Sequence, residues 1–307
     1  MYSVQPEISV VIATYNGEKY LKQQLDSILT QTITPKEIII VDDASTDGTV
    51  SILETYATDK RFRLLVNEQN TGYIKSFEKG MLHTSCPLIA LSDQDDIWLP
   101  HKLETLLTNL QNYIAVYSDS VLIAENGASL HKKMSDLKNQ LTYDNCLMYT
   151  IGAWAPGHAM LFRKELVEKS NPFPVIVTHD FWLGFVASCN GGIGYVNEVL
   201  VQYRQHTTNA IGANTHQSKK QKPTAEEKIN TARKRMQLLY EKCPVSLTEQ
   251  KQVLKTLSQT YLQNDIISRW KRMTTFFRYR NIILAYKRKS ALMRVLFCVK
   301  MFFKIDA

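Results

Sequence analysis

Four short apolar runs, each followed by residues with helical spacing, constrain the fold of this chain more than any other feature. The runs cover residues 8–14, 37–41, 62–66 and 87–91, and they are rich in Ile, Val and Leu. Nearly continuous apolar runs of this length predict strands that are buried on both faces of a parallel sheet. The alternation of strand and helix therefore predicts an α/β fold with a mainly parallel, doubly wound sheet.

Polar side chains directly follow three of these runs. Thr14, Tyr15 and Asn16 follow the first, Asp42 and Asp43 end the second, and residues 93–96 come after the fourth. Ligands of open α/β sheets bind beyond the carboxyl ends of the strands. We therefore expect the three polar clusters to line one binding site.

The last cluster, Asp93-Gln94-Asp95-Asp96, holds three carboxylates within four residues. Such carboxylates repel one another and resist burial unless a cation lies between them, and Mg²⁺ or Mn²⁺ accepts oxygen ligands of this kind. The alternative is a solvated acidic turn before the helix that follows Pro100, and short acidic motifs are frequent by chance. The position of the cluster 93–96 at the end of a predicted strand favours the metal site over the acidic turn.

The three clusters suit a nucleotide. A carboxylate at Asp42 or Asp43 can accept a hydrogen bond from the imide N–H of uracil or thymine, and the sequence leaves open which one does. Asp93 and Asp95 can meet the ribose and a metal ion that bridges the diphosphate. The chain has neither GxGxxG nor GxxxxGK[ST], so a Rossmann dinucleotide site and a P-loop are both excluded.

Residues 7 to about 210 resemble family 2 glycosyltransferases. The resemblance rests on residues 10–17, 41–49, 70–72 and 93–96. It implies a GT-A nucleotide-diphospho-sugar transferase fold and inverting sugar transfer, with Asp95 as a ligand of Mn²⁺ or Mg²⁺. The donor-binding residues that it implies are Thr14, Tyr15, Asn16, Asp42, Asp43, Gly72, Lys75, Asp93, Gln94 and Arg204.

The second half of the chain carries the expected base. From its local sequence, Asp180 is a simple cap near a helix N-terminus. The resemblance implies a different role, the general base that removes a proton from the acceptor hydroxyl. Gly157 is expected to allow a close backbone approach on the acceptor side. Arg204 and His206 are expected beside the diphosphate, with His206 also a possible metal ligand.

The segments around His179-Asp180 and Arg204-Gln205-His206 are most similar to bacterial rhamnosyltransferases. This implies dTDP-rhamnose as the donor, and a glycan or lipid-linked acceptor in cell-surface polysaccharide biosynthesis. The Gln-x-x-Arg-Trp motif of processive synthases is absent, so we do not expect chain polymerisation. A hypothesis of another class is a non-catalytic module that binds nucleotides or nucleic acid.

Composition predicts the compartment. The hydrophobic fraction of 44% and charged fraction of 21% are typical of a folded protein. The five cysteines are scattered and form no CxxC pair, which predicts a reducing compartment and argues against a zinc site or disulfides. Residues 1–7 have no signal-peptide pattern, and no apolar stretch reaches the roughly 20 residues of a membrane span. We expect a cytoplasmic location.

The C-terminal part differs in charge from the rest. We expect a glycosyltransferase domain at residues 1–215 and a helical extension at 220–307, with capping boxes at 224–227 and 246–249. Residues 269–304 contain 11 Lys or Arg and no Asp or Glu, against a net charge of +8 for the whole chain. A solvated helical face, a nucleic-acid patch and a membrane-surface helix all fit this pattern. A lipid-linked acceptor favours an anionic membrane, so we expect peripheral association with the inner face of the cell membrane and no nucleic acid.

Overall fold

A computed structural model describes residues 6–206 and 224–305, and its centre is one mixed sheet. The strand order is β3-β2-β1-β4-β8-β6-β9-β5, with β7 paired to β6. The four predicted strands are present and run parallel to one another: β1 (Ile8–Thr14), β2 (Glu37–Asp42), β3 (Phe62–Val66) and β4 (Leu88–Ser92).

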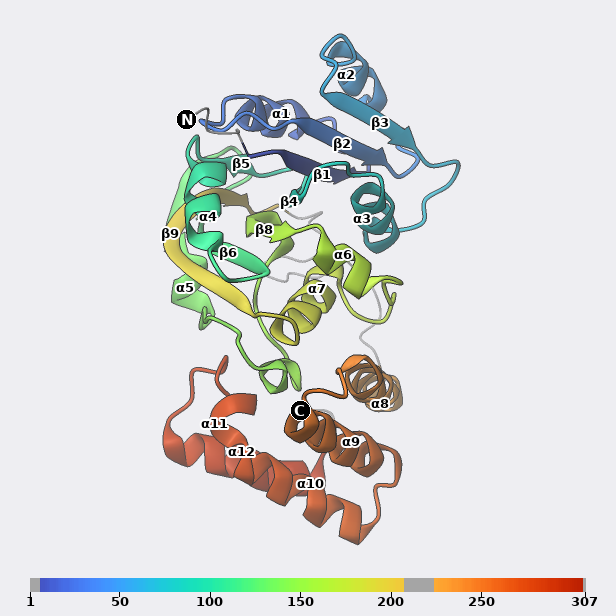
Figure 1. The fold of residues 1–307 in the computed structure, drawn as a ribbon, viewed down its shortest axis with the longest axis vertical. Coiled ribbons are helices and arrows are strands. Elements are labelled where there is room, and N and C mark those ends of the chain that lie inside the picture. Colours follow the sequence, from blue (N-terminus) through green and yellow to red (C-terminus); the bar gives the residue numbers. More distant parts are fainter. Residues whose placement is uncertain (1–5, 207–223, 306–307) are drawn as a thin grey trace.

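The second half of the sheet departs from simple parallel pairing. Strand β8 (Met160–Arg163) lies antiparallel between β4 and β6 (Ala115–Ile123). Strand β9 (Ile193–Arg204) is parallel to β6, and the short β5 (Ile97–Trp98) pairs antiparallel with β9. Strand β9 is long and curved (Figure 1). It ends at Arg204, whose backbone N–H donates to the carboxylate of Asp96, in the segment after β4, at 3.0 Å.

Helices cover both faces of the sheet, as the doubly wound prediction requires. Val11 of β1 faces a core that includes α3 (Tyr73–Leu82), α6 (Glu165–Ser170) and α7 (His179–Ser188). Its neighbours Val10 and Ile12 face the opposite core, with α1 (Leu21–Leu29), α2 (Thr49–Thr55) and α4 (Lys102–Leu110). This alternation explains why apolar residues at successive positions of the run, Val10, Val11 and Ile12, are all buried.

The polar segment 129–150 contains a strand and two short helices. It forms β7 (Ser129–Lys133), α5 (Met134–Leu137) and the 3-10 helix η1 (Cys146–Tyr149). All five residues of β7 are exposed, so no apolar alternation marked it as a strand. A second 3-10 helix, η2 (Gly157–Ala159), leads into β8.

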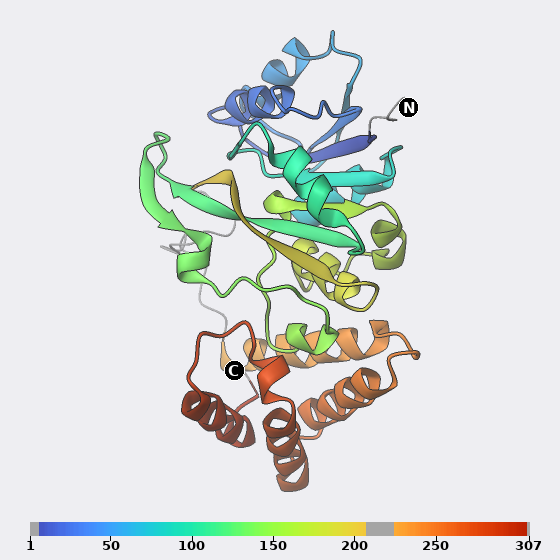
Figure 2. The ribbon, with the colours of Figure 1, turned by 60° about the vertical axis from the view of Figure 1, so that its left-hand side comes forward.

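In the predicted helical extension, the described residues 224–305 form five helices gathered at one end of the molecule (Figure 2). They are α8 (Ala225–Lys242), α9 (Thr248–Leu262), α10 (Ile266–Arg278), α11 (Arg280–Ile283) and α12 (Ala291–Phe303). The capping box of Thr224 and Glu227 is present. The box predicted at 246–249 is wrong, because α9 has Leu247 at its N-cap, without a side-chain cap. The predicted domain boundary lies outside the described residues.

The extension shares one core with the rest of the chain. Met236 of α8, Leu257 of α9, Phe276 of α10 and Met301 of α12 are buried in the same apolar cluster as Phe185 of α7. In the described ranges, 6–206 and 224–305, every helix is too short or too polar to cross a membrane.

Part of the basic tail has a structural role. Arg272 is fully buried, and its guanidinium donates to the carbonyls of Thr260 and Met301 at 2.7 Å each. Arg288 donates to the carbonyls of Ser135 and Asp136 next to α5. Main-chain carbonyls, which carry partial negative charge, therefore stabilise positive charge where carboxylates are lacking.

Candidate active site

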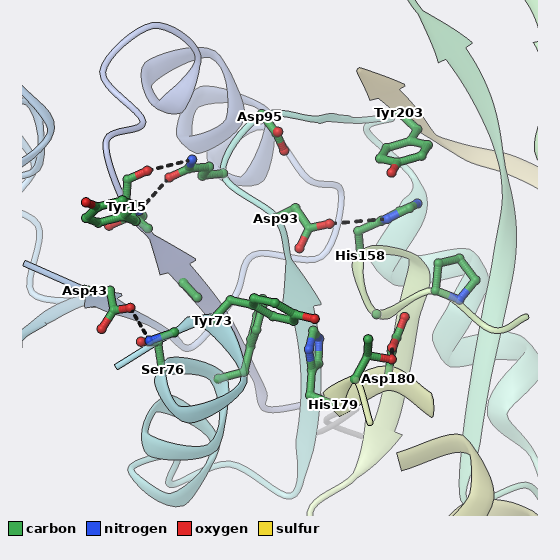
Figure 3. Close-up of a pocket in the computed structure, with 18 of the residues that line it drawn as sticks. Tyr15, Asp43, Tyr73, Ser76, Asp93, Asp95, His158, His179, Asp180 and Tyr203 are labelled. Atoms are coloured by element: carbon green, nitrogen blue, oxygen red, sulfur yellow. Dashed lines mark hydrogen bonds and ion pairs between the residues drawn. The ribbon is translucent and has the colours of Figure 1, made fainter. Parts of the chain in front are cut away.

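A cavity of about 950 Å³ lies at the carboxyl ends of β1, β2 and β4. Across from these strand ends, η2 and the first turn of α7 form its other wall (Figure 3). Ten predicted site residues line it: Thr14, Tyr15, Asn16, Asp43, Gly72, Asp93, Gln94, Asp95, Asp180 and His206. The strand-end clusters thus meet in one cavity, as the fold predicted.

The two neighbouring carboxylates Asp42 and Asp43 have different surroundings. Asp42 is fully buried and accepts hydrogen bonds from the hydroxyls of Thr14 (3.0 Å) and Ser45 (2.6 Å), which ties the ends of β1 and β2 together. It does not reach the cavity lining, whereas Asp43 does.

Asp43 organises the loop that leads into α3. Its carboxylate accepts from the backbone N–H groups of Thr71 (2.9 Å) and Gly72 (2.8 Å) and from the side chain of Asn67 (2.8 Å). Burial opposes its ionisation, but these hydrogen bonds outweigh burial and lower the pKa of Asp43 below the usual range. Gly72 has φ +87°, a conformation that favours glycine at this contact.

Gln94 holds the turn after β1. Its amide accepts from the backbone N–H of Tyr15 at 2.9 Å and donates to the carbonyl of Tyr15 at 3.2 Å. The ring of Tyr15 is 45% exposed at the cavity. Asn16 has φ +48°, and its side-chain oxygen accepts from the backbone N–H of Thr46 at 2.8 Å. These contacts give Tyr15 and Asn16 fixed backbone positions.

The two residues predicted to bind the metal lie together. Nε2 of His206 is 2.7 Å from Oδ2 of Asp95, and both side chains line the cavity. The ring of His206 also lies 5.0 Å from that of Tyr20. One oxygen and one nitrogen ligand are thereby presented to the same part of the cavity.

A second group, Asp93, Asp96 and His158, could also hold a metal ion, since one ligand atom from each lies within 4.8 Å of the others. Nδ1 of His158 is 3.6 Å from Asp93 and 3.8 Å from Asp96. His158 was not predicted as a site residue. The only sequence signal was its place in the acceptor-side segment next to Gly157.

Charges in this second group are strongly coupled. Burial raises the pKa of Asp96 to about 8, with help from the nearby carboxylates of Asp95 and Asp93. Burial disfavours charged His158, but Asp96 and Asp93 outweigh it and raise the pKa of the imidazole. Oδ2 of Asp96 is buried and has no hydrogen-bond partner among the described residues. Crowded carboxylates with an unsatisfied oxygen are an environment that a cation stabilises.

Besides Asp42, two further predicted donor-binding residues, Lys75 and Arg204, are not on the cavity lining. The guanidinium of Arg204 is buried and donates to the carbonyls of Asp95 (2.8 Å) and Glu125 (2.9 Å). Lys75 donates from Nζ to Glu78 at 2.6 Å on α3. Arg204 therefore fixes the main chain that carries Asp95, and Lys75 is engaged in an ion pair away from the lining.

Asp180 occupies the first turn of α7. The N-cap is Thr178, whose hydroxyl accepts from the backbone N–H of Phe181 and donates to the Asp180 carboxylate. Asp180 is thus not the cap that its local sequence suggests, and it lines the cavity (Figure 3). Its neighbour His179 is stacked on Phe77 at 4.1 Å between ring centroids.

The expected close approach at Gly157 is present. A Cβ atom on Gly157 would lie 2.7 Å from Nε2 of His179 and 3.5 Å from Cβ of Asp180. The glycine therefore lets η2 pack directly against the start of α7.

Comparisons with known proteins agree with this geometry. The family model described as Glycosyl transferase family 2 matches residues 9–170 of the 307. TuaG of Bacillus subtilis, a candidate teichuronic acid biosynthesis glycosyltransferase, is 31% identical over 219 residues, 70% of this chain and 84% of that protein. The dTDP-rhamnosyl transferase RfbG of Shigella flexneri is 29% identical over 221 residues, 66% of this chain and 74% of that protein.

Among solved structures, residues 1–349 of S. aureus TarS in complex with UDP-GlcNAc superpose with a TM-score of 0.60 at 16% identity. The match covers 98% of this chain and 89% of that one, and at this identity it concerns the fold. The predicted GT-A-type α/β fold is confirmed. The chain belongs to glycosyl transferase family 2.

Proposed function

We propose that this enzyme transfers a sugar from a nucleotide diphosphate to an acceptor hydroxyl with inversion, and that it depends on a divalent metal. One observation carries the proposal: the Asp95–His206 pair and the Asp180 carboxylate line the same cavity of about 950 Å³. A cavity of this size accommodates a nucleotide sugar.

The donor's nucleoside would occupy the part of the cavity formed by β1, β2 and α3. Asp43 is the carboxylate proposed to accept from a pyrimidine imide, because it lines the cavity and Asp42 does not. The exposed ring of Tyr15 offers an apolar face to the base. Asp93 remains the proposed partner of the ribose.

Asp95 and His206 are the residues proposed to hold Mn²⁺ or Mg²⁺. The bound ion would neutralise charge on the diphosphate. The residues fit, since a carboxylate oxygen and an imidazole nitrogen already converge at 2.7 Å and face the cavity. Asp93, Asp96 and His158 are the alternative set, but Asp96 is fully buried and does not line the cavity.

Asp180 is the proposed general base. Its carboxylate takes the proton from the acceptor hydroxyl while the hydroxyl oxygen bonds to the anomeric carbon. The bond from that carbon to the diphosphate breaks, and the nucleoside diphosphate leaves. Thr178 donates to Asp180 and orients it, and Gly157 lets the acceptor-side backbone approach.

The donor proposed first is dTDP-rhamnose, supported by the name of the RfbG relative and by the sequence resemblance. A UDP-sugar is the second choice, since the TarS neighbour was solved with UDP-GlcNAc. The name of TuaG supports a cell-surface polysaccharide as the product. The acceptor is proposed to be a glycan or a lipid-linked sugar.

The helical extension, proposed to begin near residue 220 after a catalytic domain at 1–215, offers a surface for membrane binding. Leu292, Leu296, Val299 and Phe303 recur at helical spacing on α12 and are 44–70% exposed. On α10, Ile266, Trp270 and Phe277 are 46–63% exposed. Exposed Lys271, Lys300 and Lys304 belong to the same region. Apolar side chains beside lysines suit the headgroup region of an anionic bilayer, at the inner face of the cell membrane.

A panel of sugar nucleotides, with dTDP-rhamnose and UDP-sugars in parallel, tests the function. We expect metal-dependent hydrolysis of one donor, and loss of hydrolysis with chelator. Binding of nucleotides without any turnover across the panel would instead support a non-catalytic nucleotide-binding module.

A further inference from the structure

Three cysteines that are far apart in the sequence meet at one point. The Sγ atoms of Cys146, Cys189 and Cys243 all lie within 4.8 Å of one another. Cys146 begins η1, Cys189 follows the last residue of α7, and Cys243 follows the last residue of α8. The scattered spacing of these cysteines in the sequence does not reveal the cluster, because the fold brings the three thiols together.

From this cluster we infer a second metal site, a three-thiolate site for a soft divalent ion such as Zn²⁺. Zinc–sulfur bonds of about 2.3 Å place tetrahedral thiolates about 3.8 Å apart, so side-chain shifts of an ångström or less would complete the site. Binding would release the protons of the thiols that are not already ionised.

The surroundings suit such an ion. Cys146 and Cys243 are 0% and 2% exposed, whereas Cys189 is only partly buried. The partly open side leaves room for water as a fourth ligand. Nζ of Lys251 donates to the carbonyl of Cys243 at 2.7 Å, so a positive charge lies beside the cluster.

The position of the cluster suggests its role. It joins the helical extension, through α8, to η1 and to the end of α7, whose first turn carries Asp180. A bound ion would fasten the extension to the helix of the proposed base. The site is separate from the carboxylates of the cavity, so it does not depend on the proposed sugar transfer.

The chain supplies its own matched controls. Cys86 and Cys298 are buried free thiols outside the cluster. The full chain, stripped with chelator under reducing conditions, would be titrated with Co²⁺ in excess Mg²⁺, which occupies carboxylate sites. We expect one equivalent of Co²⁺ to produce a thiolate-to-cobalt absorption band that Zn²⁺ abolishes. Cys189→Ser and Cys243→Ser should lose the band, and Cys86→Ser and Cys298→Ser should keep it.

Thermal unfolding supplies a second measurement. Zn²⁺ at about 100 times its Kd should raise Tm by about 5 °C in the parent chain and in both controls. The shift should be absent in Cys189→Ser, chosen because Cys189 is the most exposed of the three and its replacement disturbs the core least. A folded parent chain with neither band nor Tm shift would overturn the inference, as would a band that survives in both cluster variants. Either result would leave three ordinary free thiols, and donor hydrolysis would be unaffected.

Discussion

Nε2 of His206 lies 2.7 Å from Oδ2 of Asp95, although 111 positions separate the two residues. The length of β9 produces this contact, because the strand ends at Arg204 beside the end of β4. Arg204 anchors the arrangement: its backbone N–H donates to Asp96 at 3.0 Å, and its guanidinium donates to the carbonyl of Asp95. These hydrogen bonds from Arg204 therefore fix the main chain of the acidic motif, and the side chain of Asp95 lines the cavity.

The first prediction separates the two candidate metal sets. Asp95→Ala and His206→Ala should each lower metal-dependent transfer by about 10²-fold or more, since charge stabilisation at the diphosphate is lost. Metal titrations of transfer should require more Mn²⁺ in His206→Ala. If Asp96→Asn and His158→Ala are the variants that raise the metal requirement, and His206→Ala does not, the buried set is the metal site.

Asp180→Asn tests whether Asp180 is the general base. The amide keeps the shape of the side chain but cannot accept the proton, so kcat should fall by about 10²–10⁴-fold with the KM for the donor little changed. Thr178→Ala is the control for a capping role, because it removes the N-cap and should cost about 1 kcal/mol of stability. An Asp180→Asn enzyme with normal kcat would show that the carboxylate only supports the helix.

Asp42 and Asp43 should give different defects. Asp43→Asn should raise the KM for the donor by about 10-fold or more. The substitution removes a charged hydrogen-bond acceptor for the pyrimidine, and it weakens the hydrogen bonds that hold the loop at Thr71 and Gly72. Asp42→Asn should mainly lower Tm, because Asp42 links β1 to the turn after β2. Donor titrations and thermal unfolding of both variants distinguish the roles. A reversed pattern would indicate that Asp42, and not Asp43, contacts the pyrimidine of the donor.

Gly157→Ala probes the contact between η2 and α7. The added Cβ would lie 2.7 Å from His179, so we expect the start of α7 to shift and kcat to fall by about 10²-fold. His179→Ala removes the atom that the Cβ would meet. The double variant Gly157→Ala/His179→Ala should therefore be more active than Gly157→Ala alone. Steady-state kinetics of the parent enzyme, both single variants and the double variant would measure this recovery. Additive losses would argue against this steric explanation.

The membrane proposal predicts a localised effect. Leu296→Glu and Phe303→Glu should reduce cosedimentation with anionic vesicles, whereas Val175→Glu and Val245→Glu, which alter apolar residues exposed elsewhere, should not. Lys300→Glu should weaken binding at least about fivefold, since each lysine near an anionic leaflet contributes about 1 kcal/mol. Equal loss in all four apolar variants, or equal binding to neutral vesicles, would contradict the proposal. Salt-sensitive RNA binding instead would favour a nucleic-acid surface.

The sequence by itself determined the four parallel strands β1 to β4, their polar endings and the family. Runs such as residues 8–14 and 37–41 are mostly apolar because the sheet is covered on both faces, and this pattern is local. The polar clusters had to meet because the strand ends of a parallel sheet share one edge. The helical extension was also predictable, since its helices carry apolar residues at helical spacing.

Only the tertiary structure decided which way individual side chains point. Asp42 and Asp43 are adjacent in sequence, yet one is tied to Thr14 and the other faces the cavity. Arg204 is turned toward main-chain carbonyls, and His158 joins Asp93 and Asp96 through the placement of η2. The three thiols meet because η1, α7 and α8 pack together. These relations depend on pairing between distant segments, and no local pattern of residues records such pairing.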